Sequence, residues 1–273
     1  MPNLNNRSEN AAPVVLIFDS GVGGLTVFRE VAAARPDARY VYLADDAGFP
    51  YGNQPHDELI VRIVAVIGDA IATHKPDLIV IACNTASTIA LGMVREVLEV
   101  PVVGTVPAIK PAAALTRTGT IGLVGTEATI RQRYVDDLES RFAADKRLLR
   151  IAAPALVGAA EAKLRGEAVD PAVIADVHDR LAAMPGGAAI DTLVLACTHF
   201  PLLSEELAGA FGPQVAQVDG AQGIARRIAH LLEGQSLAIA GAPNRFVVTG
   251  PLSGAAGLEA ALAARGFGSA EAF

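Results

Sequence analysis

Two stretches of similar sequence, 114 residues apart, constrain the fold of this chain most strongly. The first reads Asp77-Leu-Ile-Val-Ile-Ala-Cys-Asn-Thr85 and the second reads Asp191-Thr-Leu-Val-Leu-Ala-Cys-Thr-His199. A continuous run of Val, Ile and Leu is typical of a strand buried on both faces, as in a parallel sheet covered by helices. Cys83 and Cys197, the only cysteines of the sequence, are therefore expected at the carboxyl ends of two such strands. In open α/β sheets that edge is where ligands bind.

Two further matches extend the repeat to most of the chain. Residues 100–108 predict a strand, and residues 215–220 lie at the same offset of 114; the run 120–126 echoes the opening strand. We therefore predict an α/β fold of two similar α/β domains with mainly parallel sheets, related by a pseudo-twofold axis, with the active site in the cleft between them. The predicted first domain comprises residues 1–110 plus 222–273 and carries Cys83. The second comprises residues 111–221 and carries Cys197.

Composition and charge exclude several classes of protein. With 52% apolar residues, 19% charged residues and a mean hydropathy of +0.39, the chain can bury a sizeable core. A net charge of −7 and a pI near 5.3 argue against direct binding of nucleic acid, which needs a basic face. An unbroken apolar run of about 18 residues is absent from the sequence, so we predict no membrane span. Two cysteines and a polar N-terminus without a secretory centre favour a cytoplasmic protein.

A glycine-rich turn, Asp19-Ser20-Gly-Val-Gly-Gly24, follows the first predicted strand and precedes a predicted helix. The dinucleotide fingerprint fails here, because Thr26 stands where its third glycine would be and Asp19 would repel a phosphate. The glycines instead allow backbone N–H groups to approach a small ligand. A tight turn without a ligand is the alternative. A second loop, Pro50-Tyr51-Gly52, is expected at the same sheet edge, where Tyr51 either closes over a ligand or anchors the loop.

The two cysteines admit several roles. Buried structural cysteines are common, but they do not need the polar residues that follow Cys83 and Cys197 here. A redox dithiol is usually a CxxC pair, and a zinc site needs about four ligands, whereas His199 is the single histidine near either cysteine in the sequence. The remaining role is proton transfer by two thiols.

Two thiols suit the inversion of a carbon that bears a hydrogen, because one removes the proton while the other delivers a proton to the opposite face. With each sulfur roughly 3–3.5 Å from that carbon, the sulfurs would stand about 6–7 Å apart. A helix N-terminus beside each sulfur favours the thiolate. Asp19 and His199 are the candidates to relay protons to Cys83 and Cys197. Alternatively, Asp19 only braces the glycine turn and His199 only caps its helix.

The motifs DSGVGGLTV, PYG, ACNTAS and ACTHFPLL, in this order, resemble the cofactor-independent glutamate racemases of the aspartate/glutamate racemase superfamily. The resemblance is collinear from about residue 14 to residue 230. It implies a site between two α/β domains, Cys83 and Cys197 as catalytic residues, no cofactor and no metal, and D-glutamate supplied for peptidoglycan synthesis. It also implies substrate contacts from nine residues: Asp19, Ser20, Pro50, Tyr51, Gly52, Asn84, Thr85, Thr198 and His199. Backbone N–H groups of these turns would receive the two carboxylates of glutamate, and hydroxyls of Thr126 and Thr129 would add to them.

Several positions depart from the pattern of the family. Asp46 and Gly48 replace the Thr or Asn and the Arg that usually precede PYG; Ala196 replaces a usual Gly and Phe200 a usual Tyr. None of these changes removes a proposed catalytic group. Glu161 matches an acidic residue that lies near the site in the family.

The resemblance further implies a homodimer and, by analogy with some members, an interaction with DNA gyrase. Three other functions compete with a glutamate racemase. They are a racemase for aspartate or a related acid, a binding protein that keeps the site without turnover, and a thiol sensor that forms a disulfide on oxidation.

Overall fold

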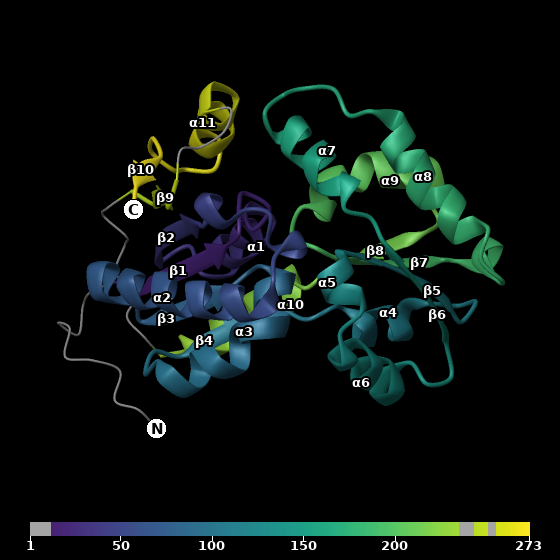
Figure 1. Ribbon diagram of the computed structural model, residues 1–273, viewed down its shortest axis with the longest axis horizontal. Coiled ribbons are helices and arrows are strands. Elements are labelled where there is room, and N and C mark those ends of the chain that lie inside the picture. Colours follow the sequence, from purple (N-terminus) through teal and green to yellow (C-terminus); the bar gives the residue numbers. More distant parts are fainter. Residues whose placement is uncertain (1–11, 235–242, 251–254) are drawn as a thin grey trace. The chain divides into compact units, whose positions relative to one another are not determined.

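The computed structural model describes residues 12–234, 243–250 and 255–273. Contacts along the chain divide it after Thr105 and after Gly220 into two compact units. Unit 1 consists of the residues up to Thr105 together with the residues from Ala221 onward. Unit 2 is Val106–Gly220. Each unit is a parallel sheet with interleaved helices (Figure 1), which confirms the predicted α/β class.

Unit 1 is built on a six-stranded sheet in the order β10-β9-β2-β1-β3-β4. Its strands are β1 (Val14–Asp19), β2 (Arg39–Ala44), β3 (Leu78–Ile81), β4 (Val102–Gly104), β9 (Arg245–Val248) and β10 (Glu271–Ala272). Its helices are α1 (Leu25–Ala34), α2 (His56–His74), α3 (Asn84–Val97), α10 (Ala221–Leu231) and α11 (Ala255–Ala263), with 3-10 turns η1 (Asp46–Gly48) and η2 (Tyr51–Asn53). The last two strands, β9 and β10, come from the chain that follows unit 2.

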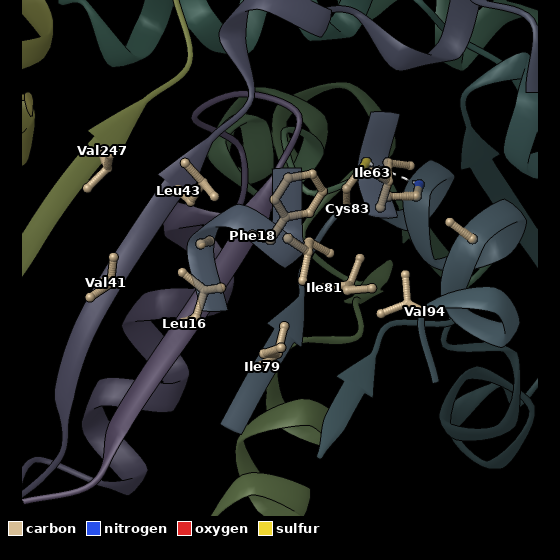
Figure 2. Packing of buried hydrophobic residues seen from close by; sticks show 14 of the residues in the cluster. Leu16, Phe18, Val41, Leu43, Ile63, Ile79, Ile81, Cys83, Val94 and Val247 are labelled. Carbon is tan, nitrogen blue, oxygen red and sulfur yellow. Dashed lines mark hydrogen bonds between the residues drawn. The ribbon is translucent and has the colours of Figure 1, made fainter. Parts of the chain in front are cut away.

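The core of unit 1 shows how the sequence places Cys83. Alternate residues of a strand face the same side, so Ile79 and Ile81 of β3 point with Cys83 into the cluster that α2 and α3 cover. Figure 2 shows these three side chains in succession, beside Leu16 and Phe18 of β1. The side chain of Cys83 is thus the last member of a core row, at the point where the strand has ended and α3 begins.

Unit 2 has a four-stranded sheet in the order β6-β5-β7-β8. Its strands are β5 (Thr120–Gly125), β6 (Arg147–Ala152), β7 (Thr192–Ala196) and β8 (Ala216–Val218). One face packs against α7 (Ala155–Leu164), α8 (Pro171–Ala182), η4 (Phe200–Leu203) and α9 (Ser204–Phe211), and the other against α4 (Ile109–Leu115) and α6 (Arg133–Phe142) (Figure 1). The short helix α5 (Glu127–Ile130) and the 3-10 turn η3 (Gly187–Ala189) complete the unit. Cys197 continues the core row of Leu193 and Leu195.

The internal repeat of the sequence is a repeat of topology. The order β2-β1-β3-β4 within unit 1 corresponds to β6-β5-β7-β8 in unit 2, and β4 and β8 lie 114 residues apart in the sequence. The predicted strand 100–108 is wrong in its extent, because β4 ends at Gly104 and α4 begins at Ile109. Pro107 contributes to this early end, since it has no N–H group for a sheet ladder. In the described part of the chain no helix has the length and apolar character required to cross a membrane.

The aspartate that opens each repeated stretch fixes the loop before the first strand of its unit. Asp77 accepts a hydrogen bond from the backbone N–H of Val14 through Oδ2, at 2.7 Å. Asp191 accepts from Thr116 Oγ1 at 2.6 Å and from the backbone N–H groups of Arg117 and Thr118 at 2.7 and 2.9 Å. Burial opposes ionisation of Asp191, but these hydrogen bonds outweigh it and lower its pKa to about 2.

Replacing Asp191 with Asn is expected to lower the free energy of unfolding by roughly 1–3 kcal/mol at pH 7, because a single amide oxygen cannot accept all the hydrogen bonds that the two carboxylate oxygens accept. The depressed pKa makes this contribution complete above about pH 4 and lost as the pH falls through about 2. Urea unfolding of wild type and D191N between pH 2 and pH 7 measures the difference. Asp137→Asn, at an exposed position of α6, is the control. A difference that does not shrink in acid would contradict the prediction.

Candidate active site

Cys83 is the N-cap residue of α3. Its Sγ accepts a hydrogen bond from the backbone N–H of Ala86 at 3.4 Å, and its thiol lies 3.6 Å from the Ser20 hydroxyl oxygen, to which it donates. A donating N–H group and the positive end of a 14-residue helix both stabilise negative charge on the sulfur. The side chain is 5% exposed, so the sulfur is held among core residues while its charged form still has donors.

Asp19 ends β1 and is completely buried. Its Oδ2 accepts a hydrogen bond from the backbone N–H of Gly24 at 3.0 Å, so this carboxylate does brace the glycine turn. Gly24 must be glycine, since a Cβ there would lie 2.7 Å from Tyr42 Oη and 2.9 Å from Asp19 Cβ. The turn is thereby pressed against the sheet edge. Bracing and proton relay are compatible roles, because the same carboxylate lies at the strand end neighbouring that of Cys83.

The loop after β2 carries Pro50, Tyr51 and Gly52. Pro50 is exposed and Gly52 is half-buried, whereas Tyr51 is 1% exposed and donates its hydroxyl to Asp45 Oδ2 at 2.5 Å. Of the two predicted roles for Tyr51, the structure shows the anchoring contact.

Asn84 and Thr85 form the first turn of α3, directly after Cys83, and both are buried. Together with Asp19, Ser20 and the loop of Tyr51, they are all at the carboxyl edge of the unit 1 sheet. Their common position at one sheet edge is what the rule for strand ends leads us to expect.

The carboxyl edge of the unit 2 sheet contains Cys197, Thr198 and His199, which follow β7 and are all buried. His199 Nδ1 lies 3.9 Å from Cys197 Sγ, and its Nε2 lies 3.1 Å from Glu161 Oε1 on α7. If Glu161 accepts the Nε2 proton, Nδ1 presents its lone pair to the thiol. The three side chains then form a cysteine–histidine–carboxylate row in which the histidine can take or return the thiol proton.

Glu161 is ionised in this row. Burial raises its pKa, but the hydrogen bond of His199, the charge that His199 carries when protonated, and the charge of Arg165 outweigh burial and hold the pKa below its usual value. Arg165 Nη1 lies 3.2 Å from Glu161 Oε2, so the two carboxylate oxygens have separate partners. A negative carboxylate at Nε2 orients the imidazole and stabilises its protonated form.

Thr126 and Thr129 lie at the end of β5, where the repeat places the counterpart of the glycine turn. Thr126 is the N-cap of α5, and its Oγ1 accepts from the backbone N–H of Thr129 at 3.3 Å and lies 3.1 Å from Thr129 Oγ1. In this arrangement both hydroxyls make contacts at the N-terminus of α5.

Sequence reasoning identified Glu161 only through the family resemblance, and it did not identify Asp45 or Arg62. Asp45 follows the end of β2, so the strand-end rule that found Asp19 also applies to it. Its partner Arg62 lies on α2, and nothing in the sequence of that helix indicates that this arginine contacts a buried carboxylate. The signal was present for Asp45 and absent for Arg62.

Comparison with known proteins places the chain in a family. The family model described as Asp/Glu/Hydantoin racemase matches residues 25–228. A glutamate racemase of Sphingopyxis alaskensis is 57% identical over 235 residues, covering 86% of this chain and 88% of that protein. A glutamate racemase of Sodalis glossinidius is 43% identical over 275 residues, covering 98% of this chain and 93% of that protein.

A solved structure agrees with the sequence relatives. Escherichia coli glutamate racemase, crystallised with L-glutamate and the activator UDP-MurNAc-Ala, superposes with a TM-score of 0.89 at 39% identity, covering 96% of this chain and 98% of that chain. Residues 25–228, which the family model matches, contain both repeated cysteine stretches of this chain. The chain therefore belongs to the Asp/Glu/hydantoin racemase family.

Proposed function

We propose that the protein is a glutamate racemase that interconverts L- and D-glutamate without a cofactor, using Cys83 and Cys197 as its two acid–base groups. The observation that carries this proposal is the equivalence of the two thiols. Each is the last residue of a core row, at the carboxyl end of a repeated strand, and each adjoins groups that can stabilise its charge. Glutamate is favoured over aspartate because the two sequence relatives above and the matched E. coli structure are glutamate racemases.

The reaction balances with the two thiols alone. One sulfur, as thiolate, takes the α-proton of glutamate and becomes a thiol, which leaves a carbanion at the α-carbon. The other sulfur, as thiol, delivers its proton to the opposite face and becomes the thiolate. The product is the other enantiomer, and the exchanged protonation states serve the reverse reaction. This scheme requires both sheet edges to meet one substrate, as the predicted cleft between two domains would allow.

The neighbouring groups have distinct parts in this proposal. His199, oriented by Glu161, relays a proton to and from Cys197, and Asp19 assists Cys83. The substrate carboxylates are received by backbone N–H groups of the Ser20, Asn84–Thr85 and Thr198–His199 turns, with Pro50, Tyr51 and Gly52 closing one side and Thr126 adding a hydroxyl.

Solvent exchange tests the function directly. Wild-type protein in D₂O with L-glutamate is expected to give D-glutamate by circular dichroism and deuterium at the α-carbon by NMR, because the delivered proton comes from a thiol in equilibrium with solvent. The same assay with L-aspartate is expected to be slower by orders of magnitude. A protein that binds glutamate without incorporating deuterium would be a binding protein, and faster turnover of aspartate would favour the related racemase.

The physiological role follows from the product. We propose that D-glutamate made in the cytoplasm supplies peptidoglycan synthesis, as the resemblance implies; restored growth of a bacterial D-glutamate auxotroph would support this. A homodimer and an interaction with DNA gyrase are also proposed by family analogy. Light scattering after size exclusion and a gyrase supercoiling assay test these two separately from the activity.

A further inference from the structure

We infer that Asp45, Arg62 and Thr249 are positioning residues that hold the Tyr51 loop in its substrate-binding position. The inference rests on the proposed function and deepens it, because it assigns a role in binding to three residues outside the motifs of the family resemblance. Arg62 lies on α2 and Thr249 follows β9, so neither belongs to the strand ends that carry the thiols.

The carboxylate of Asp45 has a complete set of donors although it is fully buried. Oδ2 accepts from Tyr51 Oη at 2.5 Å and from Arg62 Nε at 2.6 Å. Oδ1 accepts from Arg62 Nη2 at 2.6 Å and from Thr249 Oγ1 at 2.5 Å. A bidentate arginine and two hydroxyls satisfy both oxygens, so the carboxylate links three segments of chain rigidly.

The charges of this network are fixed at neutral pH. Burial opposes ionisation of Asp45, but the hydrogen bonds from Arg62, Thr249 and Tyr51 outweigh it and lower the pKa of this carboxyl. Burial and the charge of Asp45 raise the pKa of Tyr51 well above its usual value, so its hydroxyl stays a donor. Losing the Arg62 charge would leave the buried Asp45 carboxylate with two neutral donors, which is costly.

The segment before Tyr51 packs closely against the network. A Cβ at Gly48 would lie 2.5 Å from Arg62 Nε and 2.9 Å from the Tyr51 ring, so this departure from the family pattern leaves space for the guanidinium. Thr249 also accepts from the backbone N–H of Ala47 at 3.2 Å. The contacts therefore bind the backbone on the N-terminal side of Tyr51 as well as its hydroxyl.

A displaced Tyr51 would alter the wall beside the first thiol. Tyr51 and Cys83 belong to the same buried cluster, and the Tyr51 ring packs against Phe18 with 6.4 Å between ring centroids. The loop is anchored by Thr249, which is 204 residues away from Asp45 in the sequence. The chain that returns to unit 1 after unit 2 therefore supplies, directly after β9, a donor that helps to hold the loop.

The test compares Arg62→Met, Arg62→Lys and Thr249→Val with wild type in steady-state racemisation of glutamate. Arg62→Met is expected to raise KM about tenfold or more while changing kcat much less, because it loosens a binding loop without touching either thiol. Arg62→Lys, which keeps the charge but not the bidentate geometry, is expected to recover part of the loss. Thr249→Val removes one neutral donor, so its KM should rise by a smaller factor.

Arg35→Met is the matched control. Arg35 is another arginine of unit 1 with a bidentate aspartate partner, Asp37, at 2.8 and 2.6 Å, and its hydrogen bonds include neither Asp45 nor Tyr51. It is expected to lower thermal stability and leave KM unchanged. Amide hydrogen exchange of residues 46–54 should accelerate in Arg62→Met and not in Arg35→Met.

The outcomes separate this inference from the proposed function. A racemising wild type whose KM and loop exchange are unaltered by Arg62→Met would overturn the network alone. An equal rise in KM for Arg35→Met would also overturn it, since the effect would then be general destabilisation. A wild type that neither racemises glutamate nor exchanges its α-proton would overturn the proposed function instead.

Discussion

Replacing either Cys83 or Cys197 with Ala is expected to lower kcat for glutamate racemisation by at least about 10³-fold. Positioned acid–base groups contribute on the order of 10²–10⁴-fold each, and inversion needs both a proton acceptor and a proton donor, on opposite faces. Removal of one thiol therefore stops the net reaction in both directions. Circular dichroism of L- and D-glutamate solutions measures the loss.

The double variant tests whether the thiols act as a unit. Each single variant already lacks a complete pair of thiols. The double variant is therefore expected to lose little more kcat than one single variant, rather than the product of the two single losses. Thr88→Ala, in the second turn of the same helix that Cys83 caps, is the control and should remain active. Full activity in either cysteine variant would end the two-thiol proposal. Mild oxidation that abolishes activity and lowers the protein mass by two hydrogens, with both changes reversed by a reductant, would favour the thiol sensor.

The fold was largely predictable because its strongest signals are local. The short runs before Cys83 and Cys197 are rich in Val, Ile and Leu and are followed by polar residues, which favours strands, and the matching of the two runs 114 residues apart revealed the repeat. The strand 100–108 was overextended because apolar composition alone cannot show where a sheet ladder loses its partner. Helix α7 was not predicted at all. Its Ala and Gly residues give apolar character around the whole helix, so no period of 3.6 residues marks a buried face.

The site was predictable to the extent that it lies at strand ends. Asp19, Cys83 and Cys197 each follow an apolar run, and topology alone brings the first two to one edge. The contacts of Asp45 required the structure, because an arginine within a helix and a threonine after a late strand carry no mark of their shared partner. Polar contacts between distant segments depend on how the helices and returning strands pack, which periodicity does not encode.

Replacing His199 with Ala is expected to slow racemisation on the order of 10²-fold, with a smaller loss for Glu161→Gln. The reason is the row from Glu161 Oε1 through His199 to Cys197 Sγ, with separations of 3.1 and 3.9 Å. Without the imidazole, proton exchange at Cys197 becomes the slow step. Glu161 is expected to contribute no inflection to the pH dependence of kcat/KM above about pH 5, because its pKa is lowered and it stays ionised there.

Enantiomers in water have equal free energies, so kcat/KM must stay equal for L- and D-glutamate in every variant, and the ratio of rates cannot reveal which thiol His199 serves. Isotope effects can. With α-deuterated substrates, His199→Ala should raise the primary isotope effect on kcat/KM for the enantiomer that Cys197 deprotonates. It should lower the effect for the other, whose labelled bond breaks at Cys83 before the slow delivery of a proton by Cys197. Asp19→Asn, next to the first thiol, should give the opposite asymmetry. Equal isotope effects for both enantiomers in both variants would show that neither residue is tied to one thiol.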